Sequence, residues 1–349
     1  MCAPHLFIYF LLISYILYNI KFNIAKFYDI LIKEFFKKGV FVLKGIGQTH
    51  GKIILMGEHA VVYHQPCLAL PFFKATVIAT MTPSYQDQTI QCHFYSGKRQ
   101  EAPDYMTGLN AVISHILTEF KQPNISFCLK IDSSIPIERG MGSSAAVSGA
   151  VVKALYDYFN CPLSQEKLLS LINIAETINH QHPSGIDALT TTSSQAVYFI
   201  KDVQPETIQL KMNATLIIAD TGIMGQTKEA VSHIAHHINE ENYQDAITTI
   251  GKLTNQARLA IENQDIVLLG HLMNQAHKQL QHLSVSSEEL DSLVTLARQH
   301  GALGSKLTGG GRGGCIIALC ENNKTEQLIQ ALTPYANKVW SMSLKGESL

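Results

Sequence analysis

Hydrophobic and polar residues alternate along residues 125–136, where Ile125, Phe127, Leu129 and Ile131 are separated by polar side chains. A period of two is the pattern of a β-strand with one buried face. Continuous apolar runs bounded by turn residues predict further strands, at 51–63, 67–81, 196–200, 215–220 and 315–320. We interpret Lys306–Leu319 as a loop that leads into the last of these strands.

Helical periodicity dominates other parts of the chain. Residues 145–159 and 163–179 have apolar positions on one helical face, with Ser164 as the N-cap of the second helix. From Thr227 to about Arg298 the pattern is mostly helical. Strands come first and helices later, which predicts an α+β fold with two lobes. We place the lobe boundary within 201–213 and assign residues 43–205 and 206–349 to the two lobes.

Charged residues interrupt one apolar run, THGKIILMGEHAVVYHQPCLALP at 49–71. Charged groups are seldom buried without a partner, so these are either incidental surface residues or parts of a site. Lys52 is expected just before the strand, and Glu58 and His59 just after it. The two ends of one strand can therefore bring charges to one cleft.

Composition narrows the possible classes of protein. An apolar fraction of 46% in 349 residues excludes global disorder, and a net charge of -1 without long runs of one sign gives no footprint for nucleic acid. Seven cysteines without a CxxC pair indicate a reducing compartment. Cys315 and Cys320 are expected to be small core residues.

The first 42 residues differ in character from the rest. The apolar stretch LFIYFLLISYILY at 6–18 is shorter than the roughly 20 residues that span a bilayer, and it lacks a signal-peptide cleavage site. Five lysines follow it, so its insertion would keep the rest of the chain in the cytoplasm. We hypothesise that residues 1–42 are an extension absent from the native product, which would then begin near Leu43. A membrane role depends on 6–18 being present.

A glycine- and serine-rich turn precedes the helix at 145–159. Gly140 and Gly142 allow close approach of a ligand, and Ser143 and Ser144 stand where the helix begins. The unpaired N–H groups and the positive end of the helix dipole favour an anion, such as phosphate. The alternative is a serine-capped helix after a turn. The chain lacks the Walker A pattern GxxxxGK[ST], which disfavours a P-loop fold.

Two acidic residues flank a second turn, at 175–192. Asp187 follows Glu176 by eleven residues, after a Pro-Ser-Gly sequence that can fold it back. Of two carboxylates near a phosphate, one would bind Mg²⁺ and the other would accept or donate a proton. The alternative is a surface glutamate and a capping aspartate. We interpret the histidines nearby as loop residues, His180 and His182, and those further on as a polar helix face, His233, His236 and His237.

The third segment of interest, at 304–319, is rich in glycine. It formally contains GxGxxG, but an apolar strand follows the glycines where a dinucleotide site needs a helix. We therefore reject the dinucleotide interpretation. A flexible loop beside phosphates is the better functional interpretation, and a surface hairpin is the alternative.

The segments at 134–150, 175–192 and 304–319 together resemble the motifs of a known family. GKIILMGEHAVVY at 51–63, ADTGIMGQTKEAV at 219–231 and KLTGGGRGGC at 306–315 are similar to the mevalonate kinase form, bacterial type, of the galactokinase, homoserine kinase, mevalonate kinase and phosphomevalonate kinase superfamily. The resemblance covers about residues 43–349. Arg312 departs from it, because many members have glycine there. The resemblance implies a first lobe like domain 2 of ribosomal protein S5, a ferredoxin-like second lobe, and a small-molecule kinase with its site between them.

Roles for individual residues follow from the resemblance alone. It implies Asp187 as catalytic base beside Lys52, Mg²⁺ as cofactor held by Ser144 and Glu176, and mevalonate and ATP as the molecules bound. The expected ATP-binding residues are Arg139, Gly140, Met141, Gly142, Ser143, Ser144, Ala145, Gly310 and Gly311. The expected substrate-binding residues are Glu58, His59, Ser184 and Thr221.

Alternatives remain open at this point. A related kinase could act on phosphomevalonate or a sugar, and a non-catalytic ligand sensor could share the fold. A sensor should lack the base, the lysine or the metal ligands, and this chain has all of them. We expect a cytoplasmic protein, and we leave open whether it is a homodimer.

Overall fold

The computed structural model describes residues 44–85, 87–179 and 184–345, and the described residues from Gly45 onward form one compact unit. The expectations for the extension 1–42, for its apolar stretch 6–18, and for His180 and His182 lie outside the described residues. Within the described residues, no helix has the length and apolar character needed to cross a membrane.

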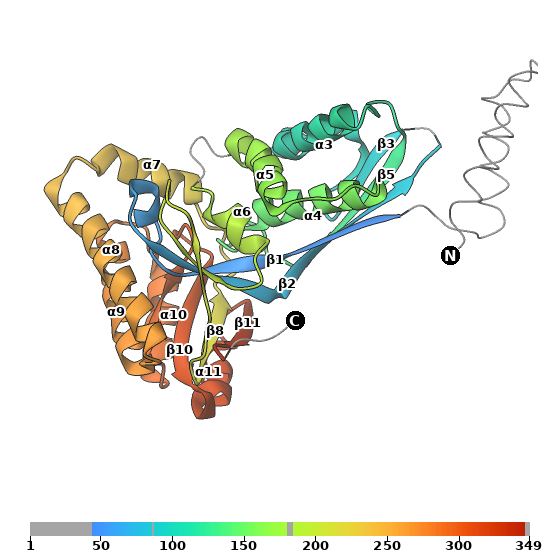
Figure 1. Ribbon diagram of the computed structural model, residues 1–349. Helices are drawn as coiled ribbons and strands as arrows, with labels where there is room; N and C mark the ends of the chain where they lie inside the picture. The colour runs from blue at the N-terminus through green and yellow to red at the C-terminus, as the bar shows by residue number, and fades with distance from the viewer. Residues whose placement is uncertain (1–43, 86, 180–183, 346–349) are drawn as a thin grey trace, which may run out of the picture. The chain divides into compact units, whose positions relative to one another are not determined.

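The first part of the chain forms a seven-stranded sheet in the order β4-β3-β5-β2-β6-β7, with β1 paired to β2. Helices α3, α4 and α5 lie on one side of it (Figure 1). The long strand β2 pairs antiparallel with β1, β5 and β6, so it is the centre of this lobe. The elements are β1 (Gly45–Met56), β2 (Cys67–Pro83), β3 (Gln88–Cys92), β4 (Tyr95–Lys98), α3 (Thr107–Glu119), β5 (Phe127–Ser133), α4 (Ser143–Tyr158), α5 (Gln165–Asn179), α6 (Ile186–Thr191), β6 (Ala196–Phe199) and β7 (Glu206–Ile208).

The second part forms a four-stranded sheet in the order β11-β8-β10-β9. Its central strand β8 is buried along its whole length, and its side chains alternate between two cores: Leu216 and Ile218 join one, Ile217 and Ala219 the other. The elements are β8 (Ala214–Asp220), α7 (Thr227–His237), α8 (Glu241–Glu262), α9 (Ile266–His282), α10 (Glu288–Gln299), β9 (Gly304–Thr308), β10 (Cys315–Glu321), α11 (Thr325–Leu332) and β11 (Lys338–Ser343).

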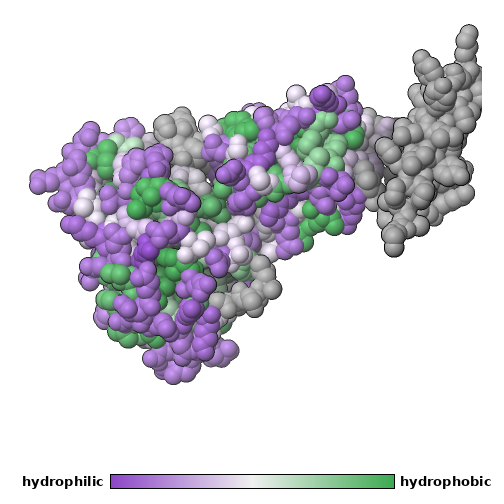
Figure 2. All heavy atoms as spheres, in the orientation of Figure 1, coloured by the Kyte–Doolittle hydropathy of each residue, from purple (hydrophilic) through white to green (hydrophobic). Residues whose placement is uncertain are grey.

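One of these two cores runs across both sheets. It contains Leu55 and Phe72 of the first sheet together with Ile218 and Ile317 of the second. On the face drawn in Figure 2, by contrast, the hydrophobic side chains form separate small areas among hydrophilic ones. The two sheets are therefore joined by a shared hydrophobic interior.

Most predicted elements are confirmed, including the strands at 67–81, 125–136, 196–200, 215–220 and 315–320, the helices at 145–159 and 163–179, and the mostly helical region that follows Thr227. Ser164 caps α5, because its hydroxyl oxygen accepts a hydrogen bond from the backbone N–H of Lys167 at 3.2 Å. Cys315 and Cys320 are fully buried, as expected. The α+β, two-lobed fold class is confirmed as well.

The predicted strand at 51–63 is wrong in its second half. β1 ends at Met56, and Ala60–Tyr63 is a 3₁₀ helix. The reason is the turn between them, where Gly57 and His59 have φ of 100° and 62° and reverse the chain. Buried Ala60 and Val61 satisfy a strand pattern and a helical turn equally well, so hydropathy alone could not separate the two.

The predicted loop at Lys306–Leu319 also needs correction. Its first residues belong to strand β9, which is buried throughout and pairs antiparallel with β10. The glycine-rich segment, residues 309–314, is the turn between these two strands. The first sheet reaches Ile208 and the second begins at Ala214, and the expected division at residue 205 stays a prediction.

Candidate active site

Lys52 and Asp187 form an ion pair, with Lys52 Nζ 3.0 Å from Asp187 Oδ1. Lys52 lies within β1 rather than before it, and Asp187 lies in the first turn of α6. The lysine side chain is 3% exposed and the aspartate side chain 37%. The pair is thus buried on the lysine side and open on the carboxylate side, where a ligand can reach it.

The turn before α4 lies directly against Lys52. The backbone N–H of Lys52 donates to the carbonyl of Met141 at 3.0 Å. Gly142 caps α4 with a φ of 71°, and a Cβ there would lie 2.9 Å from Cγ of Lys52. Only glycine fits, so the residues Gly140–Ala145 bring the start of α4 beside the ammonium group. Both the unpaired N–H groups of a helix start and the ammonium favour an anion.

Ser144 and Glu176 are brought together as predicted. Ser144 Oγ donates to Glu176 Oε1 at 2.7 Å, and Asn179 Nδ2 donates to Ser144 Oγ at 3.1 Å. Burial raises the pKa of Glu176 to about 7, although the Ser144 hydrogen bond opposes the shift. The negative charge of Asp187 raises this pKa further, and the positive charge of Lys52 lowers it. Asp187 and Glu176 therefore act on one another electrostatically.

The turn 309–314 packs on the turn before α4. A Cβ on Gly309 would lie 2.5 Å from Cα of Gly140, and a Cβ on Gly140 would lie 2.9 Å from Cα of Gly309. Both have positive φ. Gly310 accepts a hydrogen bond through its carbonyl from His59, and Gly311 accepts one from the backbone of Gln226. The two glycine-rich segments, far apart in sequence, thus meet backbone to backbone.

Glu58 and His59 are more deeply buried than substrate ligands on an open surface would be. Glu58 is 1% exposed and accepts a hydrogen bond from Lys306 Nζ through Oε1, while its Oε2 has no partner in the protein. His59 Nε2 lies 3.0 Å from the carbonyl oxygen of Gly310. Burial lowers the pKa of His59 to about 4, so the imidazole is neutral and donates through Nε2.

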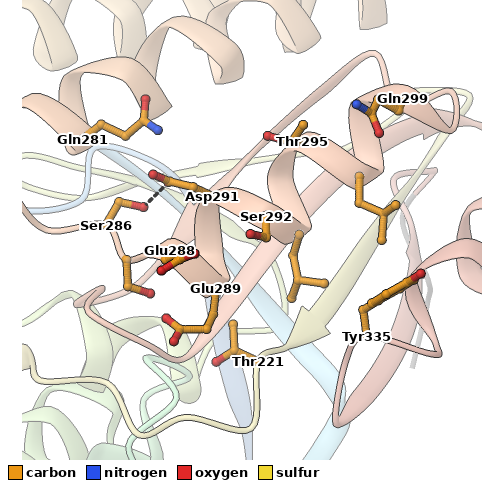
Figure 3. A pocket seen from close by; sticks show the side chains of 13 residues that line it. Thr221, Gln281, Ser286, Glu288, Glu289, Asp291, Ser292, Thr295, Gln299 and Tyr335 are labelled. Atoms are coloured by element: carbon orange, nitrogen blue, oxygen red, sulfur yellow. Dashed lines mark hydrogen bonds between the residues drawn. The ribbon is translucent and has the colours of Figure 1, made fainter.

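Of three other predicted ligands, two bond to other parts of the protein and one precedes α6. The Arg139 guanidinium is 2.8 Å from Asp220 Oδ1 and donates to the carbonyl of Gly222, so it joins the turn before α4 to the second lobe. The Thr221 hydroxyl donates to the carbonyl of Gly314 at 2.8 Å. Thr221 lines a cavity of about 1240 Å³ beside α10, with Glu289 and Tyr335 (Figure 3). That cavity contains neither Lys52 nor Asp187. Ser184 is half-buried just before α6.

Sequence reasoning missed two residues of this region. Asn179 lies three residues after Glu176 on α5, so a helical spacing could have indicated it. Lys306 was placed in a loop, although a lysine inside an apolar strand pattern is itself a signal. Among the described residues, no group of three or more His, Cys, Asp or Glu side chains could hold a metal ion.

Comparisons with known proteins agree with this two-lobed architecture. Residues 108–195 match the family model for the N-terminal domain of GHMP kinases, and residues 257–337 match that for the C-terminal domain. The fold and the site thus define a two-lobed small-molecule kinase, and the chain belongs to the GHMP kinase family.

Individual relatives are mevalonate kinases. The mevalonate kinase of Pyrococcus furiosus is 30% identical, over 88% of this chain and 99% of its own length. A crystal structure of the Leishmania major enzyme in complex with R-mevalonate superposes with a TM-score of 0.71 at 25% identity, covering 86% of this chain and 95% of that one. The crystal structure of the Staphylococcus aureus mevalonate kinase superposes with a TM-score of 0.66 at 30% identity, covering 87% of this chain and 99% of that one. The curated relatives are mostly archaeal, and the comparisons do not support the expected bacterial type.

Proposed function

We propose that the protein is a mevalonate kinase, which transfers the γ-phosphoryl group of ATP to the C5 hydroxyl of mevalonate. The observation that carries the proposal is the ion pair of Lys52 and Asp187, placed beside the start of α4. A carboxylate that can accept a proton lies there next to positive potential for a phosphoryl group. The names of the relatives supply the identity of the alcohol.

In this mechanism the protein mainly positions the two substrates and stabilises the negative charge of the transition state. Phosphoryl transfer passes through a loose state with negative charge on the equatorial oxygens, so electrostatics dominate. The N–H groups at the start of α4 and the Lys52 ammonium face that charge. Asp187 accepts the proton of the attacking hydroxyl, a contribution of roughly 10²–10⁴-fold for a general base. The turn 309–314 shields the phosphates from water.

Ser144 and Glu176 fit a magnesium site. The two oxygens are 2.7 Å apart, and burial disfavours the charged form of Glu176, a penalty that a bound cation would relieve. Mg²⁺ is typically held by one or two carboxylates together with substrate phosphates. When bound, the ion neutralises charge on the phosphates. Glu176→Gln should therefore raise the Mg²⁺ concentration needed for half-maximal activity, and an unchanged Mg²⁺ dependence would contradict the assignment.

A coupled assay of ADP release from the full chain tests the proposed function. Mevalonate, phosphomevalonate and galactose are compared with Mg·ATP at equal concentrations. We expect mevalonate to give the highest kcat/KM. A higher value for phosphomevalonate or galactose would assign a sister activity within the family, and no turnover with any alcohol would favour a ligand sensor.

Two further expectations stay predictions. Cell fractionation tests the cytoplasmic location, and light scattering of the purified full chain tests whether it forms a homodimer.

A further inference from the structure

Strand β9 carries a lysine that none of the roles above uses. Lys306 is 0% exposed, and its Nζ donates to Glu58 Oε1 and, at 2.7 Å, to the carbonyl of Leu307. An ammonium group so enclosed cannot reach the phosphates of a nucleotide. Its position therefore has to be explained by what it does to Glu58.

Three contacts at a spacing of two residues fasten this strand and its turn to the first lobe. Lys306 binds Glu58, the Thr308 hydroxyl exchanges hydrogen bonds with the N–H and carbonyl of Ile54 at 3.1 and 2.9 Å, and the Gly310 carbonyl meets His59. Side chains at i and i+2 of a strand share one face, so this face of β9 is turned toward β1 and the bend that follows it.

The same contacts bind one oxygen of the Glu58 carboxylate and leave the other oxygen buried without a hydrogen-bond partner in the protein. Lys306 binds Oε1, and Oε2 is the oxygen without a partner. A buried carboxylate oxygen without a hydrogen bond is costly, unless a ligand supplies the donor. Glu58 follows the strand Gly45–Met56 that carries Lys52, and the positive charge of Lys52 lowers the pKa of Glu58, so Glu58 belongs to the same region as the Lys52–Asp187 pair.

We propose that Lys306 is a positioning residue for the alcohol side of the site: it holds Glu58 by Oε1 so that Oε2 accepts a hydrogen bond from a hydroxyl of the acceptor substrate other than the one that is phosphorylated. This inference rests on the proposed function. Lys306 does not touch the substrate, and it acts through the orientation and the charge of Glu58.

The charge of Glu58 depends on its surroundings in a defined way. Burial raises its pKa, and Lys306 and, more weakly, Lys52 lower it. His59 and Cys67 are uncharged, because burial lowers the pKa of His59 to about 4 and raises the pKa of the Cys67 thiol. The charged groups that act on these two side chains include Asp187 and Arg312 as well as the two lysines. Removing the Lys306 charge should therefore favour the protonated form of Glu58, which no longer presents a carboxylate to the alcohol.

The test compares Lys306→Met, Glu58→Gln and the double variant Lys306→Met/Glu58→Gln with the wild-type full chain. For Lys306→Met we expect kcat/KM for mevalonate to fall at least about tenfold, as for truncation of a buried charge pair, while KM for ATP stays within about twofold. The acid limb of the pH profile of kcat/KM for mevalonate should move to higher pH. The double variant should lose that displacement, because the group that titrates is gone.

The outcomes separate the inference from the proposed function. Lys306→Met could lower kcat/KM equally for mevalonate and for ATP, or could leave the acid limb of the pH profile unmoved. Either result would mean that Lys306 only supports the fold. If Lys306→Met does not fold, the double variant, which buries no unpaired charge, decides: a wild-type KM for mevalonate overturns the inference. If the wild type phosphorylates mevalonate but the variants give one of these contrary results, only the inference about Lys306 is refuted. If the wild type phosphorylates no alcohol, both the inference and the proposed function are refuted.

Discussion

Two lysine–carboxylate pairs lie close together in this molecule, and their surroundings differ. In the pair Lys52–Asp187 the carboxylate is 37% exposed, whereas in the pair Lys306–Glu58 the two side chains are 0% and 1% exposed. Both consist of the same two functional groups. Burial decides whether such a pair can bind and release a proton during a reaction or instead fixes one conformation.

The difference follows from where the elements place each partner. Asp187 stands in the first turn of the short helix α6, just after a glycine turn, and Glu58 stands in a tight bend between β1 and a 3₁₀ helix. Lys306 projects from a strand buried on both faces. Solvent reaches the first pair through the carboxylate and does not reach the second. We therefore expect the Lys52–Asp187 pair to take part in the reaction and the Lys306–Glu58 pair to hold one fixed conformation.

The largest effect should come from the open pair. Asp187→Asn removes the proton acceptor and keeps the shape of the side chain, so kcat should fall by about 10²–10⁴-fold while ATP still binds. The coupled ADP assay measures kcat, and equilibrium titration measures ATP affinity. An Asp187→Asn protein with near-wild-type kcat would remove Asp187 from the role of base.

The next effect compares how much each lysine contributes to the free energy of unfolding. Lys306→Met leaves Glu58 as an unpaired buried carboxylate and should lower the free energy of unfolding by about 3–5 kcal/mol. Lys52→Met should cost less, because water can solvate the exposed part of Asp187. Urea unfolding at neutral pH measures both losses. Equal losses for the two variants would show that the exposure of the carboxylate does not matter.

A smaller effect tests the contact between the turn before α4 and the open pair. Gly142→Ala places a Cβ against Lys52 and keeps a positive φ, so it should lower both kcat and stability, the latter by about 1–2 kcal/mol. Gly301→Ala is the matched control, since Gly301 has a φ of 100° and its Cβ would meet only the Lys324 side chain at 3.8 Å. The control should lose stability and keep its kcat. A kcat loss in both would disconnect the turn from the catalytic lysine.

The last effect is expected only on acidification and concerns a histidine behind the buried pair. His277 Nδ1 accepts from the backbone N–H of Leu307, its Nε2 contacts Asp291, and burial lowers its pKa to about 4 from 6.5. The unfolded chain binds a proton here as the pH falls below 6.5, and the folded chain does so only near 4. Stability of up to about 3 kcal/mol is therefore present above pH 6.5 and lost on acidification toward pH 4.

The variant His277→Gln isolates this contribution. Its free energy of unfolding should depend less on pH between 6.5 and 4 than that of the wild type, as measured by urea unfolding at several pH values. His236→Gln, at an exposed histidine on α7, controls for the substitution itself. Parallel pH curves for His277→Gln and the wild type would contradict the assignment.

The sequence by itself determined many of the strands and helices and the segments that carry chemistry. Periodicity gave β2, β5 and the helices of the second lobe, because these elements have long one-sided or continuous apolar patterns. Glycine and serine before α4 and the carboxylates Glu176 and Asp187 were visible as residue types that phosphate and metal chemistry need. The resemblance then joined them into one expected site.

Only the tertiary structure decided which charged groups meet and how deeply they lie. Nothing in the spacing of Lys306 and Glu58 indicates their pairing, since it depends on β9 facing β1 across the shared interior. For the same reason, the sequence did not indicate the ion pair between Arg139 and Asp220 of the second sheet, and the expected ATP-binding role of Arg139 stays a prediction. Local patterns record the hydropathy of each face, whereas the burial of a charge depends on contacts between residues that are distant in the chain.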